Sequence, residues 1–150
     1  MSEGTVEHIH IANAKGAPVR ALRSVEAIAG VGLAGDRNAI PGADPEENCN
    51  VTLIEAENIE ALARDHGIEL APGDSRRNIT TRGVRLNLLV GREFSIGPVT
   101  ARGLELCEPC NGLQRALAKP VIKPLLHRAG LRAELLTGGT ISIGDAIRAD

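Results

Sequence analysis

The chain has 150 residues and a formal net charge of −2, which is the size of one ordinary domain. This weak charge gives no electrostatic reason to expect a nucleic-acid partner. Phe94 is the one aromatic residue among Phe, Tyr and Trp, so bases would find few stacking surfaces and the core must be aliphatic. No apolar run approaches the roughly 18–20 residues that span a bilayer. We therefore expect a single domain over residues 1–150 with no nucleic-acid and no membrane partner.

The cysteines are sparse and odd in number: Cys49, Cys107 and Cys110. Such a set does not form the disulfide framework of a small secreted protein. The N-terminal stretch MSEGTVEHIHIANAKG has neither a basic flank nor a continuous apolar region, unlike a signal peptide. We therefore expect a cytoplasmic protein with reduced thiols.

Short strand-like segments, punctuated by glycine and proline, run through the chain. In the first half of the chain we predict strands within 6–12 and 18–28, a long polar loop at 30–50, a buried strand at 50–54 and a helix at 55–67. A strand within 73–83 and two strands joined by a Gly-Pro corner within 86–106 follow. The chain then continues with two helical pieces at 111–119 and 124–130 and two or three strands within 131–150. Many short strands with few long helices favour a mainly β, barrel-like core with attached helices.

The segment LELCEPCNGL (104–113) places two thiols two residues apart, between a strand and a helix. Cys110 precedes Asn111, a good N-cap, and a helix N-terminus favours the reactive thiolate form. Cys107 ends an apolar strand and could equally point into the core. A thioredoxin-like redox pair fits the spacing but not the late position of the motif.

Zinc binding would require two further ligands beside this pair of cysteines. The available side chains are Cys49, His8, His10, His66 and His127. His8 and His10 alternate along a strand and face the same side, but half-exposed strand histidines without a metal are more common. Zinc therefore stays an alternative.

Two basic, glycine-associated segments could bind an anion. GLAGDRNA (32–39) couples a tight Gly-Asp turn to Arg37, and SRRNITTRG (75–83) contains Arg76, Arg77, Asn78 and Thr80. Arginine forks and backbone amides suit phosphate or another oxyanion, and Asn and Thr can read a polar heterocycle. Neither segment has the GxxxxGK[ST] order of a P-loop. Each alone is typical of a surface loop; together with the thiols they favour a ligand site.

The segments GLAGDRNA, NVTLIEAENIEAL, SRRNITTRGVRLNLLVGREFSIG, LELCEPCNGL and LLTGGTISIGD, in this order, resemble the MOSC family, named for the C-terminal domain of molybdenum cofactor sulfurases. The resemblance covers about residues 5–148. It implies a MOSC-type β-barrel-like fold that binds the molybdenum cofactor (Mo-molybdopterin), a pterin dithiolene carrying a phosphate.

The resemblance also implies roles for individual residues. In the family one cysteine ligates molybdenum or carries sulfur, and Cys110 resembles it. The resemblance and the basic segments together suggest cofactor-binding roles for Arg37, Arg76, Arg77, Asn78 and Thr80, with auxiliary roles for Cys107, Gly35 and Asp36. One departure is Asn38, which stands where relatives often have histidine.

Three functions follow as hypotheses. The first is molybdenum cofactor binding with Cys110 as metal ligand or sulfur carrier; the second is reduction of N-hydroxylated compounds with that cofactor; the third is a non-catalytic or zinc-binding adaptor module. These residues contain neither the N-terminal domain of the amidoxime-reducing members nor the desulfurase domain of the sulfurases. We therefore expect a separate partner, either a pyridoxal phosphate-dependent cysteine desulfurase or an electron donor. The aliphatic strands also allow a homodimer.

Overall fold

The structure is a computed structural model that describes residues 2–44 and 50–149. The candidate zinc ligand Cys49 lies outside the described residues. The strands are β1 (Ser2–Ile11), β2 (Arg20–Leu22), β3 (Ser24–Ile28), β4 (Gly32–Leu33), β5 (Val51–Glu55), β6 (Ile79–Arg82), β7 (Glu93–Ile96), β8 (Val99–Leu106), β9 (Leu131–Leu135), β10 (Gly139–Ser142) and β11 (Ala146–Ala149). The helices are α1 (Ala56–His66), α2 (Asn111–Leu117) and α3 (Ile122–Leu125), with a 3₁₀ helix η1 (Leu86–Leu89).

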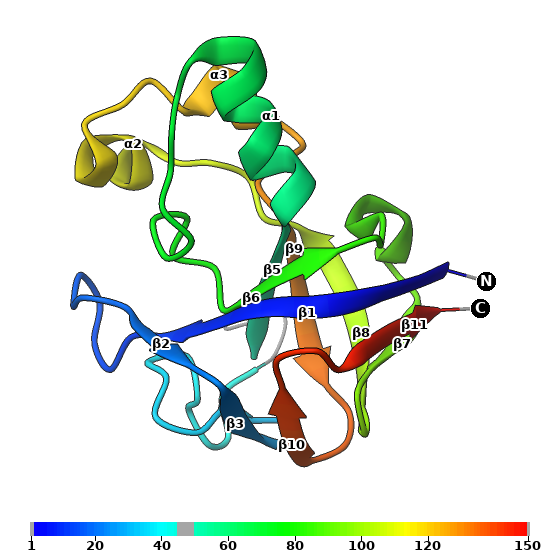
Figure 1. Cartoon of the computed structure of the whole chain (residues 1–150). Coiled ribbons are helices and arrows are strands. Elements are labelled where there is room, and N and C mark those ends of the chain that lie inside the picture. Colours follow the sequence, from blue (N-terminus) through cyan, green and yellow to red (C-terminus); the bar gives the residue numbers. More distant parts are fainter. Residues whose placement is uncertain (1, 45–49, 150) are drawn as a thin grey trace.

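Seven strands form a closed barrel in the order β11-β7-β8-β9-β5-β6-β1, and the pairing of β1 with β11 closes the ring. The parallel pair is β5 with β6, and the other pairs of this ring are antiparallel. The two termini consequently lie side by side (Figure 1). The predicted mainly β, barrel-like fold with attached helices is confirmed.

The barrel interior is aliphatic, as the composition predicts. In β9 the side chains of Leu131, Ala133 and Leu135 are buried, while the intervening Arg132 and Glu134 remain partly exposed. This alternation is the ordinary consequence of strand geometry, in which successive side chains point to opposite faces. The same geometry places charged side chains on the outer wall of the barrel.

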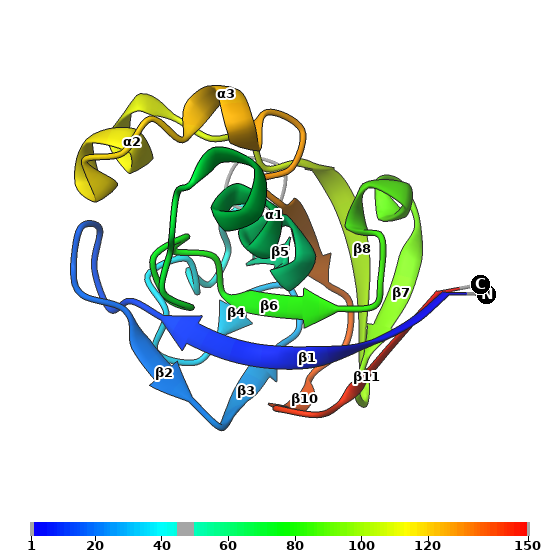
Figure 2. The same cartoon turned by 45° about the horizontal axis from the view of Figure 1, so that its top comes forward.

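The helices lie at one end of the barrel and the small sheet β10-β3-β4 lies at the other (Figures 1 and 2). Helix α1 ends where predicted, because Gly67 adopts φ 66° and its N–H bonds back to the last turn. A second apolar cluster joins the three helices through Leu62, Leu113, Val121, Leu125 and Ala129. No described helix is long and apolar enough to cross a membrane.

Two predictions near the cysteines are wrong in detail. Cys110 itself, and not Asn111, caps α2, because its Sγ accepts a hydrogen bond from the Leu113 N–H at 3.4 Å. The helical piece predicted at 124–130 instead spans Ile122–Leu125. It stops there because Leu126 has the non-helical ψ of 124°, and the left-handed φ of 61° at His127 turns the chain further from a helical path. Residues 126–130 therefore form an irregular segment that leads into β9.

Candidate functional site

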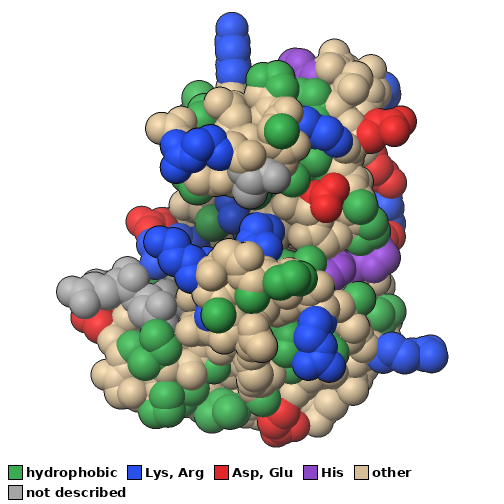
Figure 3. Space-filling view, turned by 90° about the vertical axis from the view of Figure 1, so that its left-hand side faces the viewer, with side chains coloured by type: hydrophobic (Ala, Val, Ile, Leu, Met, Phe, Trp, Pro, Cys, Tyr) green, Lys and Arg blue, Asp and Glu red, His purple; other side chains and the backbone are tan. Residues whose placement is uncertain are grey.

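A polar cavity of about 290 Å³ lies at the barrel edge where β1 and β8 end and β6 begins. It is lined by His10, Ile11, Ala12, Val19, Asp36, Arg37, Asn38, Thr52, Arg76, Arg77, Asn78, Cys107 and Arg132. Figure 3 shows a hollow on this side of the molecule, between the helical part and the barrel, with Lys and Arg side chains around it. The two basic segments and one of the two nearby thiols thus meet in one place.

The Gly-Asp turn forms one wall of the cavity. Gly35 has φ 86°, a conformation that glycine adopts without steric cost. The buried Asp36 carboxylate accepts the N–H groups of Ala12, at 3.0 Å, and of Asn38, at 3.2 Å. The Arg37 N–H donates to the Ala12 carbonyl at 2.7 Å. Asp36 therefore ties the turn to the end of β1 and brings Arg37 to the rim.

The two neighbouring arginines are held by uncharged partners. Arg76 has φ 59°, and its Nη2 donates to the Ala17 carbonyl at 2.7 Å. Arg77 Nε donates to the Ala129 carbonyl at 2.9 Å. A backbone carbonyl orients a guanidinium without neutralising it, and each guanidinium has five N–H donors. Both cations therefore keep charge and donors available for an anionic ligand.

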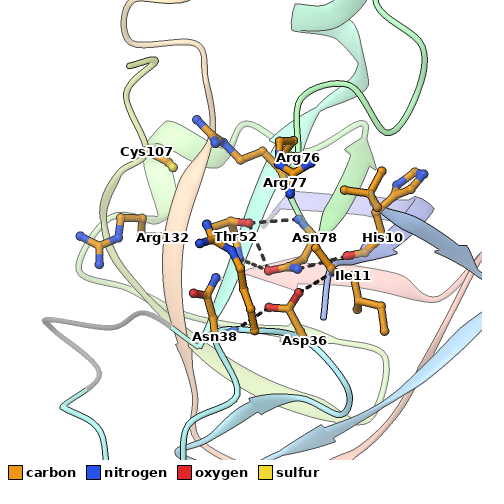
Figure 4. A pocket seen from close by; sticks show the side chains of 13 residues that line it. His10, Ile11, Asp36, Asn38, Thr52, Arg76, Arg77, Asn78, Cys107 and Arg132 are labelled. Atoms are coloured by element: carbon orange, nitrogen blue, oxygen red, sulfur yellow. Dashed lines mark hydrogen bonds between the residues drawn. The ribbon is translucent and has the colours of Figure 1, made fainter. Parts of the chain in front are cut away.

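The floor of the cavity is a closed hydrogen-bond network (Figure 4). Asn78 Oδ1 accepts both the N–H and the hydroxyl of Thr52, at 3.0 and 3.1 Å. Asn78 Nδ2 donates to the His10 carbonyl at 3.1 Å, and the Asn78 N–H donates to Thr52 Oγ1 at 3.0 Å. Asn78 thus joins β1, β5 and β6. Its side chain at the cavity therefore serves mainly to hold these strands together.

Several lining residues lie outside the predicted site residues, and Arg132 and His10 are two of them. Arg132 reaches the cavity from β9 and forms an ion pair with Glu105 on β8. The alternation of apolar and charged residues in LRAEL predicts that Arg132 lies on the outer face of the sheet. It does not predict that Arg132 lies beside this cavity. His10 was considered only as a zinc ligand; it is buried, and its burial and the neighbouring His8 lower its pKa.

The two thiols lie in different environments. Cys107 is partly buried and lines the cavity, whereas Cys110 is exposed and is not among the lining residues. No disulfide joins them. The role predicted for Cys110 stays a prediction, while the geometry places the sulfur of Cys107 beside the arginines.

Two other predicted residues lie away from the cavity wall. Thr80 is buried beside His8 in a separate cavity of about 170 Å³, and its hydroxyl has no hydrogen-bond partner within the described residues. Gly35 shapes the turn but does not line the cavity. His8 and His10 do lie close, with ring centroids 6.1 Å apart. Within residues 2–44 and 50–149, however, no three His, Cys, Asp or Glu side chains form a metal-binding group.

The charged side chains that line the cavity are mostly basic, although one of them, Arg132, is paired with Glu105. The four arginines of the cavity are Arg37, Arg76, Arg77 and Arg132, and the carboxylate that lines it is Asp36. Because that carboxylate accepts two backbone N–H groups, it is committed to the turn. The cavity is therefore suited to an anionic ligand.

Comparison with known proteins agrees with this fold. The structure is similar to the YUAD protein from Bacillus subtilis, with 19% identity and a TM-score of 0.81 over 97% of this chain and 94% of that chain. It is similar to YiiM from Geobacillus stearothermophilus, with 15% identity and a TM-score of 0.71 over 96% of this chain and 73% of that chain. It is also similar to YiiM from Escherichia coli, with 15% identity and a TM-score of 0.69 over 96% of this chain and 68% of that chain.

A comparison with curated protein sequences gives no significant match. The family model of the MOSC domain matches residues 33–148, a span that contains the Gly-Asp turn, the arginine segment and both described cysteines. The chain therefore belongs to the MOSC domain family.

Proposed function

We propose that the chain binds the molybdenum cofactor in this cavity and uses a thiol of the CEPC segment as molybdenum ligand or sulfur carrier. The MOSC domain family is generally linked to molybdenum cofactor binding. The observation that carries the proposal is the meeting of four arginines and the Cys107 thiol in one cavity of about 290 Å³.

The residues present fit the phosphate of that cofactor. Arg76 and Arg77 are anchored by backbone carbonyls at 2.7 and 2.9 Å, so their remaining donors can form charge-assisted hydrogen bonds with an oxyanion. Arg37 adds positive charge at the same cavity, whereas Arg132, which also lines it, is paired with Glu105. Because the anchors are already in place, ordering of these long side chains costs less on binding.

The thiols fit the metal end of the cofactor. Soft thiolates are favoured ligands for a soft metal site, and a persulfide also requires an accessible thiol. When bound, the cofactor supplies the metal at which sulfur exchange or two-electron reduction takes place. The family resemblance favours Cys110 for the reactive role, and the lining of the cavity favours Cys107. A separate protein, either a cysteine desulfurase or an electron donor, is part of the same proposal.

The test is molybdenum and pterin analysis of protein purified anaerobically from a molybdenum-replete host. We expect both in the wild-type chain and a loss of molybdenum from the variant of whichever cysteine is the ligand, Cys107→Ser or Cys110→Ser. Thr80→Ser serves as a control that retains a hydroxyl away from this cavity. A wild-type sample with neither molybdenum nor pterin would contradict the proposal.

A further inference from the structure

Four consecutive carbonyl groups between α3 and β9 each accept a hydrogen bond from a different part of the molecule. The donors are Asn87 Nδ2 to His127 O at 2.8 Å, Asn58 Nδ2 to Arg128 O at 3.3 Å, Arg77 Nε to Ala129 O at 2.9 Å, and the Cys107 N–H to Gly130 O at 2.8 Å. We call residues 127–130 the bracket. It joins η1, α1, the loop before β6 and the end of β8.

The backbone of the bracket is held in an uncommon conformation. His127 has φ 61° and Gly130 has φ 119°. A left-handed conformation is unfavourable for a residue with a side chain, so surrounding contacts must maintain it. At Gly130 a side chain would collide with the carbonyl of Leu53. The bracket is therefore shaped by tertiary contacts and not by local helix or strand preference.

Glu108 ties the bracket to the segment that carries the thiols. Its Oε1 accepts the His127 N–H at 2.7 Å, and its Oε2 lies 2.6 Å from His127 Nδ1. Glu108 lies between Cys107 and Cys110 in the chain. The bracket thus holds the start of this segment twice, through the Cys107 N–H and through the Glu108 carboxylate.

We propose that the bracket sets the position of the Cys107 thiol relative to the Arg77 guanidinium, and that Glu108, His127 and Asn87 are positioning residues for this pair. The carbonyls that hold Arg77 and Cys107 belong to adjacent residues, Ala129 and Gly130. A displacement of the bracket therefore moves the anion-binding end and the thiol end of the cavity together. The inference deepens the proposed function and rests on it for its chemical meaning, because it concerns the same site.

The test uses the full chain without cofactor. Iodoacetamide alkylation of Cys107 and Cys110 is followed by peptide mass spectrometry, with fragment ions that separate the two thiols. Glu108→Ala is expected to raise the alkylation rate of Cys107 about tenfold, the factor that corresponds to loss of a weak charge-assisted hydrogen bond. Asn87→Ala is expected to raise it about twofold, because it removes a neutral, exposed contact. The rate for the already exposed Cys110 should not change in either variant.

Asn87→Ala carries the test on its own if Glu108→Ala fails to fold. Asn87 has no charge, so its variant separates loosening of the bracket from loss of a carboxylate beside the thiol. The matched control is Glu60→Ala, which removes a carboxylate paired with Arg82 away from the bracket; neither thiol should respond to it.

A second readout follows the Arg77 end of the cavity. Titration with inorganic phosphate, monitored by NMR, should show weaker binding in Asn87→Ala by about twofold. Faster alkylation of Cys107 together with weaker phosphate binding supports the proposal. A change in only one of them, equal acceleration of both thiols, or no change in folded variants overturns it. These outcomes need no molybdenum, so they are distinct from failure of the proposed function.

Discussion

The floor and the rim of the cavity can be compared residue by residue. On the floor, Asn78 and Thr52 direct their side-chain polar atoms to one another and to β1. On the rim, Arg76 and Arg77 each use a nitrogen to hold a neutral backbone carbonyl. The side chains of Asn78 and Thr52 are satisfied without a ligand, whereas the rim keeps charge and donors for one.

This difference separates residues that the sequence presents as equivalent. Arg76, Arg77 and Asn78 are consecutive and all line the cavity. Substitution of the asparagine should act on folding, because it breaks a buried network, and substitution of an arginine should act on binding. The predictions below test that division, from the largest expected effect to the smallest.

The largest effect is expected for Asn78→Ala. Removal of this amide leaves the Thr52 N–H and the His10 carbonyl without their buried partners. We expect the free energy of unfolding to fall by about 3 kcal/mol, since several buried polar groups lose hydrogen bonds. Urea denaturation measures it. Asn58→Ala, which removes an exposed bond to a carbonyl, is the control, with a loss below about 1 kcal/mol. Equal losses would contradict the structural role of the floor.

An intermediate effect, on binding and not on folding, is expected for Arg77→Ala. Loss of one of four cavity arginines should weaken binding of inorganic phosphate at low ionic strength about tenfold, or about 1.4 kcal/mol. The free energy of unfolding should change by less than about 1 kcal/mol. Calorimetric or NMR titration measures the affinity. Arg64→Ala, on the exposed surface of α1, should leave the affinity unchanged; equal weakening would argue for a nonspecific charge effect.

The smallest effect concerns the pH dependence contributed by His10. Burial first, and then the positive field of His8, lower the pKa of His10 below its ordinary value of 6.5. The unfolded chain therefore binds this proton more readily than the folded chain. The contribution to stability is flat above pH 6.5 and declines as the pH falls from there toward the lowered pKa.

His10→Gln should reduce this decline. Urea denaturation of both proteins at a series of pH values measures the difference between their slopes. Identical slopes would show that the His10 side chain is protonated equally in the folded and unfolded states. His66→Gln, on the exposed end of α1, provides the matched control.

Several residues that the sequence predicts as ligand contacts lie together at the cavity, because their local chemistry makes them recognisable in the sequence. The Gly-Asp turn at 35–37 requires a glycine with positive φ and a carboxylate that accepts N–H groups, and the structure contains both. Arg37, Arg76, Arg77 and Asn78 were each predicted to meet a ligand, and all four line the cavity. Their roles are nevertheless unequal, since the fold binds the amide of Asn78 within the barrel.

The residues that sequence reasoning missed depend on contacts between distant segments. Arg132 reaches the cavity because β9 pairs with β8 and with β5. A local sequence pattern does not predict which strands become neighbours in the sheet. The exposed position of Cys110 reflects its role as the cap of α2. Cys107 faces the cavity because β8 ends against Gly130.

The sequence by itself determined the aliphatic alternation of the strands, the amphipathic α1 with its glycine stop and the Gly-Asp turn. It also determined that the chain contains a pair of consecutive arginines and a CxxC segment. These features depend on side-chain period, backbone freedom and composition, which are local properties. Only the tertiary structure decided that β1 and β11 close the barrel, that Arg132 joins the other arginines, and that Cys107 lies at the cavity. Those outcomes depend on the register of strands distant in sequence and on the left-handed backbone at His127, which the surrounding contacts maintain.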